Sequence, residues 1–145
     1  MSDTIKSAVT LNSHFLGALS IELDRRIEIG PTPAGARNFA VIAGGTLKGP
    51  AINAKILPGG SDSLVRGSDG SGRPDCRLIL ETDDGAIILV RYQGIRFVEG
   101  DQDYWRCLPL FETASDKYGW MNRIICVSLG RMDDGVIVYD IFQID

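Results

Sequence analysis

The chain has 145 residues, enough for one domain with a buried core. Its formal net charge is −4 and its basic residues are spread singly or in pairs, which argues against a nucleic-acid partner because such a protein needs a basic patch. No apolar run is long enough to cross a bilayer, and the N-terminus lacks the pattern of a signal peptide. We therefore expect one cytoplasmic domain over residues 1–145 with no membrane partner, and a poorly ordered or edge segment at 1–13.

The 17 glycines occupy turn-like positions, and no stretch keeps apolar residues at helical spacing, so many short strands are expected. The first strand is predicted at 15–23, with Phe15, Leu19 and Ile21 on one face. Two prolines and two glycines predict a loop at 29–38.

Further strands are predicted at 39–42 and 51–57. The paired glycines at 44–45 and 59–60 permit backbone bends of the kind found at bulges and barrel corners. Residues 67–75 are predicted to form a mobile polar loop.

The segment 76–92 is predicted to be a hairpin around Asp83-Asp84-Gly85. A three-residue loop places Leu78 inside and Arg77 outside, whereas a two-residue loop would bring Arg77 to the apolar face. We favour the three-residue loop because it separates charge from the core. The outer face keeps three large aliphatic residues, Ile79, Ile87 and Leu89. A homodimer is therefore expected.

The remaining strands are predicted at 104–113, 118–129 and 136–144. Asp133-Asp134-Gly135 repeats the turn chemistry of residues 83–85 and leads into the last of them. About eight to ten strands with no intervening helix predict an all-β fold, a single antiparallel barrel rather than a parallel sheet.

Several segments in order resemble the domain of unknown function 3237 family of small barrels. They are GPTPAGAR, GGTLKGP, LPGGSD, DCRLILETDDGA and FETASDKYGWMNR. The family is similar to calycin or lipocalin-like barrels, which implies a ligand cavity but no general activity. One departure is Ser63, where the family usually has a tryptophan, which implies a roomier or more polar pocket.

Several site chemistries have no support in the sequence. His14 is the only histidine and no nucleophile-elbow motif is present, so a Ser-His-Asp site is not indicated. Cys76, Cys107 and Cys126 stand singly, as buried reduced thiols do. No metal-ligand cluster or phosphate-binding glycine motif is present, so we expect no metal and no cofactor.

Asp62 ends a double-glycine segment where a ligand could approach the backbone, although an Asx-turn is an equal alternative. Arg106 and Glu112 are six residues apart and share a strand face, with Pro109 between them as a possible break in register. If that face is inward, the pair could orient a polar group and Glu112 could move a proton. If it is outward, they are surface charges.

Tyr118, Trp120 and Asn122 also share a predicted strand face, suited either to an aromatic ligand or to core packing. Tyr92 lies on the predicted inner face as core or cavity wall.

Two functions remain open. The first is a cofactor-independent enzyme acting on a small, largely apolar or aromatic hydroxylated or carbonyl metabolite. Asp62 or Glu112 would move a proton in an isomerase, cyclase, hydratase or carbon–carbon lyase reaction, while Arg106 or Asn122 holds developing charge. The second is a carrier barrel that binds the same small hydrophobic ligands without chemistry.

Overall fold

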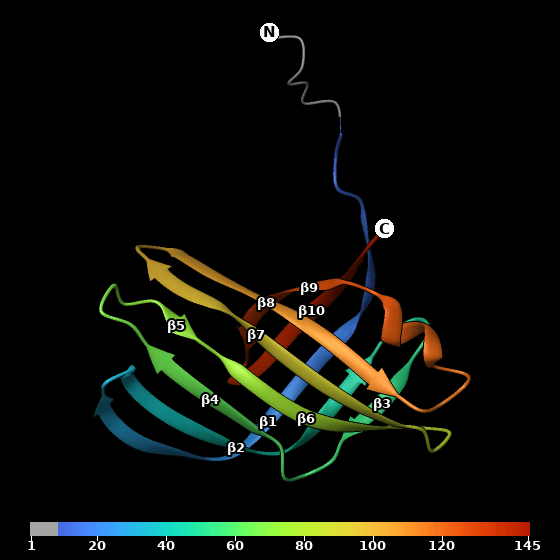
Figure 1. Ribbon diagram of the computed structural model, residues 1–145, viewed down its shortest axis with the longest axis horizontal. Coiled ribbons are helices and arrows are strands. Elements are labelled where there is room, and N and C mark those ends of the chain that lie inside the picture. The colour runs from blue at the N-terminus through green and yellow to red at the C-terminus, as the bar shows by residue number, and fades with distance from the viewer. Residues whose placement is uncertain (1–8) are drawn as a thin grey trace, which may run out of the picture.

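The computed structural model describes residues 9–145, and their strands form one antiparallel sheet that closes on itself as a barrel (Figure 1). The strands are β1 (Ser13–Thr32), β2 (Gly35–Lys48), β3 (Asn53–Ile56), β4 (Ser61–Arg66), β5 (Gly72–Arg73), β6 (Asp75–Thr82), β7 (Ile87–Glu99), β8 (Gln102–Thr113), β9 (Cys126–Asp133) and β10 (Val136–Ile144). Because β1 pairs with both β10 and β2, the sheet is closed. The expected all-β barrel is confirmed.

The segment expected to be poorly ordered or an edge, 1–13, falls mostly on residues 1–8, which lie outside the described residues. Residues 9–12 lead into β1 without regular structure. Within residues 9–145, no helix combines the length and apolar character that a membrane crossing requires.

The loop expected at 29–38 is wrong, because β1 and β2 form a long hairpin through this region. Beyond Ile21, β1 pairs only with β2. Pro31 is therefore tolerated, since one edge of the strand has no neighbour that would need its missing N–H. At the start of β1, a register shift between Phe15 and Gly17 turns Phe15 outward, so it does not share the face of Leu19 as expected.

The paired glycines at 44–45 bend β2 but do not end it. Gly45 has a φ of 138°, and a Cβ there would lie 2.0 Å from the backbone oxygen of Ser20. The expected bend is present because only glycine permits this approach of β2 to β1. Sequence reasoning missed β4, which follows the second glycine pair, and placed β5 in a loop.

The β6–β7 hairpin has the predicted three-residue loop. The Thr82 N–H donates to the Ala86 carbonyl at 2.9 Å, and Gly85 has a φ of 89°. Leu78 is buried and Arg77 is exposed, as this register requires. Ile87 is exposed on the outer face, where the pairing of a second copy stays a prediction.

The β9–β10 hairpin has a tighter turn than its Asp-Asp-Gly sequence suggested. Asp133 pairs directly with Val136, which leaves a two-residue turn. Asp134 and Gly135 both have positive φ, 50° and 81°, as a type I′ turn demands. The last strand, Val136–Ile144, has the predicted bounds.

The strand predicted at 118–129 is wrong in its first half. Residues Gly119–Arg123 form a short 3-10 helix, η2, and β9 begins only at Cys126. Tyr118 and Met121 are three residues apart, so the helical turn directs both to one side. Both are buried there and pack into one end of the barrel. We call this the closed end.

The opposite end carries the tips of the β1–β2, β4–β5 and β7–β8 connections, which lie together at the left of Figure 1. The fully buried aliphatic side chains fill the barrel toward the closed end; they include Leu19, Leu47, Ile52, Leu80, Ile88 and Ile141. We call the opposite end the open end, because these aliphatic side chains do not fill its interior.

Candidate functional site

The open end contains a cavity of about 260 Å³ inside the barrel. Its side chains come from six strands, so its shape depends on the closed sheet rather than on one motif. The lining residues are Arg26, Asn38, Asp62, Leu64, Arg66, Gly72, Pro74, Arg96, Trp105, Ile137 and Tyr139. The cavity combines one carboxyl group, three arginines and two aromatic side chains.

Asp62 supplies the carboxyl group. It projects inward from β4, and its Oδ1 accepts a hydrogen bond from the backbone N–H of Asp75 at 3.0 Å. This fixes the side chain across the sheet and replaces the Asx-turn considered from the sequence. Burial raises the pKa of Asp62, and the nearby Arg26 only partly opposes this. The protonated carboxylic acid is therefore favoured relative to an exposed aspartate.

Two tyrosines form the floor beneath Asp62. The rings of Tyr92 and Tyr139 lie 4.9 Å apart, and burial raises the pKa of both phenols well above the ordinary value. Burial also raises the pKa of the adjacent Cys107 thiol to about 12 and that of Cys76 still further. These groups are neutral at physiological pH, so the floor offers hydroxyls and thiols rather than a thiolate nucleophile.

Trp105 forms one wall. Its ring stands edge-on to Tyr139 with centroids 5.3 Å apart, and the Arg96 guanidinium lies 3.9 Å from its centroid. The other side of the ring rests on Gly130, where a Cβ would come within 2.5 Å of it. Trp105 is only 4% exposed, and its Nε1–H has no hydrogen-bond partner among the described residues.

Three arginines surround the entrance, and we call Arg26, Arg66 and Arg96 the arginine mouth. Arg96 makes a two-pronged ion pair with Asp103. Arg26 and Arg66 donate instead to neutral oxygens, those of the Asn38 side chain and the Gly70 backbone. Neither has a carboxylate within ion-pair distance in residues 9–145.

A lateral groove of about 570 Å³ adjoins the cavity where β1 separates from β10. It shares Arg26, Arg96 and Ile137 with the cavity, and apolar side chains such as Leu23 and Met132 extend it outward. The open end therefore has a polar centre and an apolar side branch.

Of the two alternatives for Arg106 and Glu112, the structure shows the outward one. In β8 the buried positions are Trp105, Cys107, Pro109 and Phe111. Glu112 is exposed on the outer wall, and Arg106 lies over the ring of Tyr104, a residue that is itself 53% exposed. Neither residue belongs to the cavity, because the strand alternation turns both away from it.

Tyr118, Trp120 and Asn122 lie at the closed end, so the prediction that they line a shared strand face is also wrong. They belong to η2 and its N-terminal flank. Asn122 accepts from the Thr113 N–H at 2.8 Å and donates to the Thr113 carbonyl at 3.0 Å, which satisfies its amide. Trp120 lines a different hollow, beside His14.

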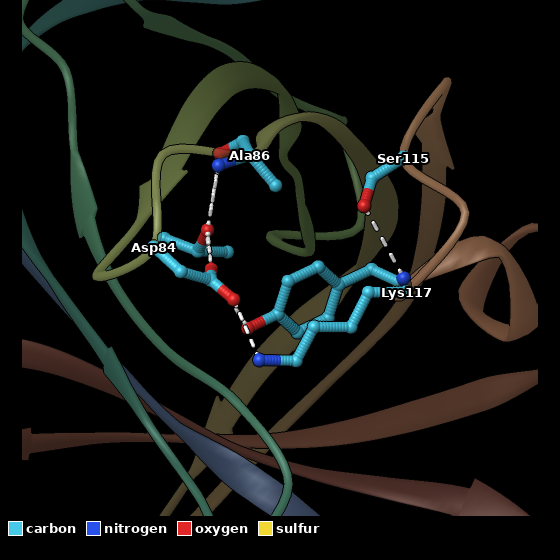
Figure 2. A network of polar contacts seen from close by, with 6 residues as sticks. Asp84, Ala86, Ser115 and Lys117 are labelled. Atoms are coloured by element: carbon cyan, nitrogen blue, oxygen red, sulfur yellow. Dashed lines mark hydrogen bonds and ion pairs between the residues drawn. The ribbon is translucent and has the colours of Figure 1, made fainter.

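Tyr118 takes part in a polar network around Asp84, shown in Figure 2. The Asp84 carboxylate accepts from the Thr82 hydroxyl at 2.6 Å, the Tyr118 hydroxyl at 3.0 Å and the Lys117 ammonium at 2.6 Å. These donors, Lys117 foremost, lower the pKa of Asp84. We call Asp84, Thr82, Lys117 and Tyr118 the Asp84 cluster; it ties the β6–β7 turn to the segment that covers the closed end.

Of the predicted site residues, Asp62 and Tyr92 alone lie at or next to the cavity. Sequence reasoning missed the arginine mouth, Trp105 and Tyr139. Arg26 was assigned to no strand, since the first strand was expected to stop at 23. The phase of Tyr139 with Ile137 and Ile141 was the available signal that it faces inward. Among residues 9–145, no three His, Cys, Asp or Glu side chains are grouped to hold a metal ion.

Residues 11–144 match the model of the family described as protein of unknown function (DUF3237). The chain belongs to this family. A UPF0311 protein of Clostridium acetobutylicum is 33% identical over 144 residues, covering 88% of this chain and 91% of that protein. A crystal structure described as a beta-barrel like protein, from Acinetobacter baumannii, superposes with a TM-score of 0.88 at 27% identity, covering 97% of this chain and all of that one.

One more distant relative is named for an enzymatic activity. The hydroalkoxylation enzyme of Penicillium herquei is 34% identical over 84 residues, covering 57% of this chain and 50% of that protein. The crystal structure of an enzyme from Penicillium herquei superposes with a TM-score of 0.76 at 25% identity and covers 97% of this chain and all of that chain. The chain is thus related to at least one enzyme.

Proposed function

We propose that this family member is an enzyme that uses acid–base chemistry at Asp62 to add a hydroxyl group across a carbon–carbon double bond within one small aromatic substrate. The observation that carries the proposal is Asp62 itself, a carboxyl group held in a cavity with a raised pKa and one hydrogen-bonded oxygen. The Penicillium herquei relative supports it, since hydroalkoxylation is the addition of an O–H group to a double bond.

The proposed reaction leaves the protein unchanged, because the proton that Asp62 donates is replaced by one from the substrate. The protonated Asp62 delivers its proton to one alkene carbon while the π bond breaks. The hydroxyl oxygen of the substrate forms a C–O bond to the other carbon, and the hydroxyl proton passes to the carboxylate. The substrate is cyclised, its composition is unchanged and Asp62 returns to its acid form.

The surrounding groups favour this chemistry. Trp105 and Tyr139 add apolar surface to the cavity lining, and the Nε1–H of Trp105, which has no partner among residues 9–145, is a donor left for a substrate oxygen. Donors that are already in place cost no reorganisation when charge develops during the reaction. The neutral phenol of Tyr92 lies below and belongs to the floor rather than to the reacting set.

The test uses two simple substrates, 2′-hydroxychalcone with a conjugated double bond and 2-allylphenol with an isolated one. We expect the wild type to accelerate ring closure of at least one of them, measured by absorbance and chromatography. Asp62→Asn should lower the rate by about 100-fold or more, the usual contribution of a positioned acid or base. Glu112→Gln, on the outer wall, is the matched control and should leave the rate unchanged.

The acid form of Asp62 is the active one, so the rate should fall as pH rises through the raised pKa of Asp62. A wild type that binds either compound in a thermal-shift assay but does not cyclise it would favour the carrier barrel instead. Equal rates for the wild type and Asp62→Asn would remove Asp62 from the reaction.

A further inference from the structure

We propose that the cavity recognises an acidic aromatic ligand, a planar ring bearing a carboxylate or an equally anionic oxygen, and that Arg26 and Arg66 bind the anionic group. The inference deepens the proposed function in that it names the class of substrate for the same cavity, and it rests on that proposal only for the chemistry that follows binding.

The entrance of the cavity carries an imbalance of charge. The whole chain has a formal net charge of −4, yet the cavity is lined by three arginines and one carboxyl group. Even with the Asp62 carboxyl group ionised, the arginine side chains of the lining outnumber it. The lining is therefore cationic in a protein that is anionic overall, and an anion entering it gains a favourable field.

The three arginines of the mouth differ in their partners. The charge of Arg96 is matched by Asp103 at 2.9 Å, so this side chain serves mainly to cover Trp105. Arg26 and Arg66 hydrogen-bond only to neutral oxygens, at 3.3 Å and 3.0 Å. Each guanidinium has five donors, so most of the donors on these two remain for a ligand, and their fork matches a carboxylate.

Trp105 supports an oxygen-bearing ligand independently of the arginines. Trp105 lines the cavity, and its buried Nε1–H has no acceptor among the described residues. A buried donor without an acceptor costs free energy, which a ligand oxygen would recover. Trp105 and Tyr139 also make part of the lining aromatic, which suits a ring attached to that oxygen.

The test follows the indole N–H signals of the protein by NMR while 2-naphthoate or the neutral 2-naphthamide is added. The chain has two tryptophans, one at each end of the barrel, and Trp120→Phe assigns them. We expect 2-naphthoate to shift the Trp105 signal and leave the Trp120 signal in place. The amide should bind about tenfold more weakly, because it lacks the charge.

Arg26→Gln and Arg66→Gln should each weaken 2-naphthoate about threefold to fivefold, a modest effect because both side chains are solvent-accessible. They should not alter binding of the amide. Arg37→Gln is the matched control, since Arg37 projects outward from β2 and donates to the Ser63 hydroxyl. It should leave both affinities unchanged, and circular dichroism of each variant checks the fold.

Equal affinities for the acid and the amide, a shift at Trp120 instead of Trp105, or the same loss in Arg37→Gln as in Arg26→Gln would overturn the inference. The readout is binding alone, so it separates the two proposals. If 2-naphthoate binds as expected and neither phenol is cyclised, the substrate class stands and the proposed reaction does not. If cyclisation is confirmed and 2-naphthoate fails to bind, the reverse holds.

Discussion

The two ends of the barrel differ in how far their buried polar groups are satisfied by hydrogen bonds. At the closed end, the Asp84 carboxylate meets three donors, and the amide of Asn122 makes two hydrogen bonds to Thr113. At the open end, Trp105 has a buried N–H with no acceptor in residues 9–145, and Asp62 carries a raised pKa. Satisfied polar groups stabilise a fold, whereas unsatisfied ones cost stability and are retained where a ligand completes them.

This difference also explains why aromatic residues alone do not identify the site. Tyr118 and Trp120 combine aromatic bodies with polar groups, as Tyr139 and Trp105 do. At the closed end the Tyr118 hydroxyl already donates its proton to Asp84, so this donor is not free for a ligand. The open end differs in what its polar groups lack rather than in the residue types present.

The strongest test of the comparison adds one carbon at each end. Gly130→Ala places a Cβ within 2.5 Å of the Trp105 ring, which is held on its other sides by Tyr139 and Arg96. We expect a loss of about 2 kcal/mol in the free energy of unfolding, typical of overpacking, together with a displaced Trp105 indole signal and weaker 2-naphthoate binding. Denaturant unfolding and NMR measure these effects.

Gly119→Ala at the closed end is the control, because a Cβ there meets nothing within 4 Å. It should change neither stability nor binding. If Gly130→Ala is as stable as the wild type, the Trp105 wall is not as tightly held as the packing indicates.

A second test disrupts the Asp84 cluster. Asp84→Asn removes the charge that Lys117 and Tyr118 bind, and we expect the melting temperature to fall by about 2–4 °C at neutral pH without any change in 2-naphthoate affinity. Asp83→Asn, at the exposed neighbouring position of the same turn, should have no such effect.

The contribution of Asp84 to stability should depend on pH in a defined direction. The folded state lowers the pKa of Asp84 below its ordinary value of 3.8, so its contribution to stability is present above that value and is lost as pH falls through the lowered pKa. Thermal melts from pH 7 to pH 2 should show a shallower loss for Asp84→Asn than for the wild type. Parallel curves would show that the cluster does not stabilise the fold.

The smallest effect is expected at Asp62, and in the opposite direction. Because the folded state raises its pKa above 3.8, this carboxyl group favours folding at low pH and loses that contribution as pH rises through the raised pKa. Asp62→Asn carries no charge to desolvate, so it should melt at an equal or slightly higher temperature than the wild type at pH 7 while losing activity. A clear drop in melting temperature would mean that Asp62 serves the fold rather than a reaction.

Local chemistry made part of the fold predictable. The β6–β7 hairpin follows from Asp83-Asp84-Gly85 and from strands whose charged residues all fall on one face. The second Asp-Asp-Gly turn adopts a different type, although its sequence is the same. In the first turn the Thr82 hydroxyl accepts from the Ala86 N–H at 2.8 Å and donates to Asp84, which stabilises the wider loop. The residue preceding the turn, not the turn itself, distinguishes them.

The site was less predictable, because alternation fails where both faces of a strand are apolar. In β8 the outward Tyr104, Leu108 and Leu110 are 45–57% exposed, so hydrophobicity gave no indication that Trp105 faces inward. Arg26 and Arg66 lie on β1 and β4, which reach the same region because both strands pair with β2. Asp62 was found because a double glycine precedes it, although its hydrogen bond to Asp75 spans 13 residues that no local pattern describes.

The separation of β1 from β10 has one more consequence. From Glu22 to Thr32, β1 has a neighbour on one side only, so the opening beside the cavity leaves an unpaired strand edge in the described part of the chain. Such an edge invites a strand from another molecule and is a common start of aggregation. Here the stretch carries Asp24, Arg25, Glu28 and Pro31, together with three register shifts in its pairing with β2. These charges, the proline and the irregular backbone discourage strand addition. A small ligand can therefore enter beside this edge, while pairing with a strand of another molecule is disfavoured.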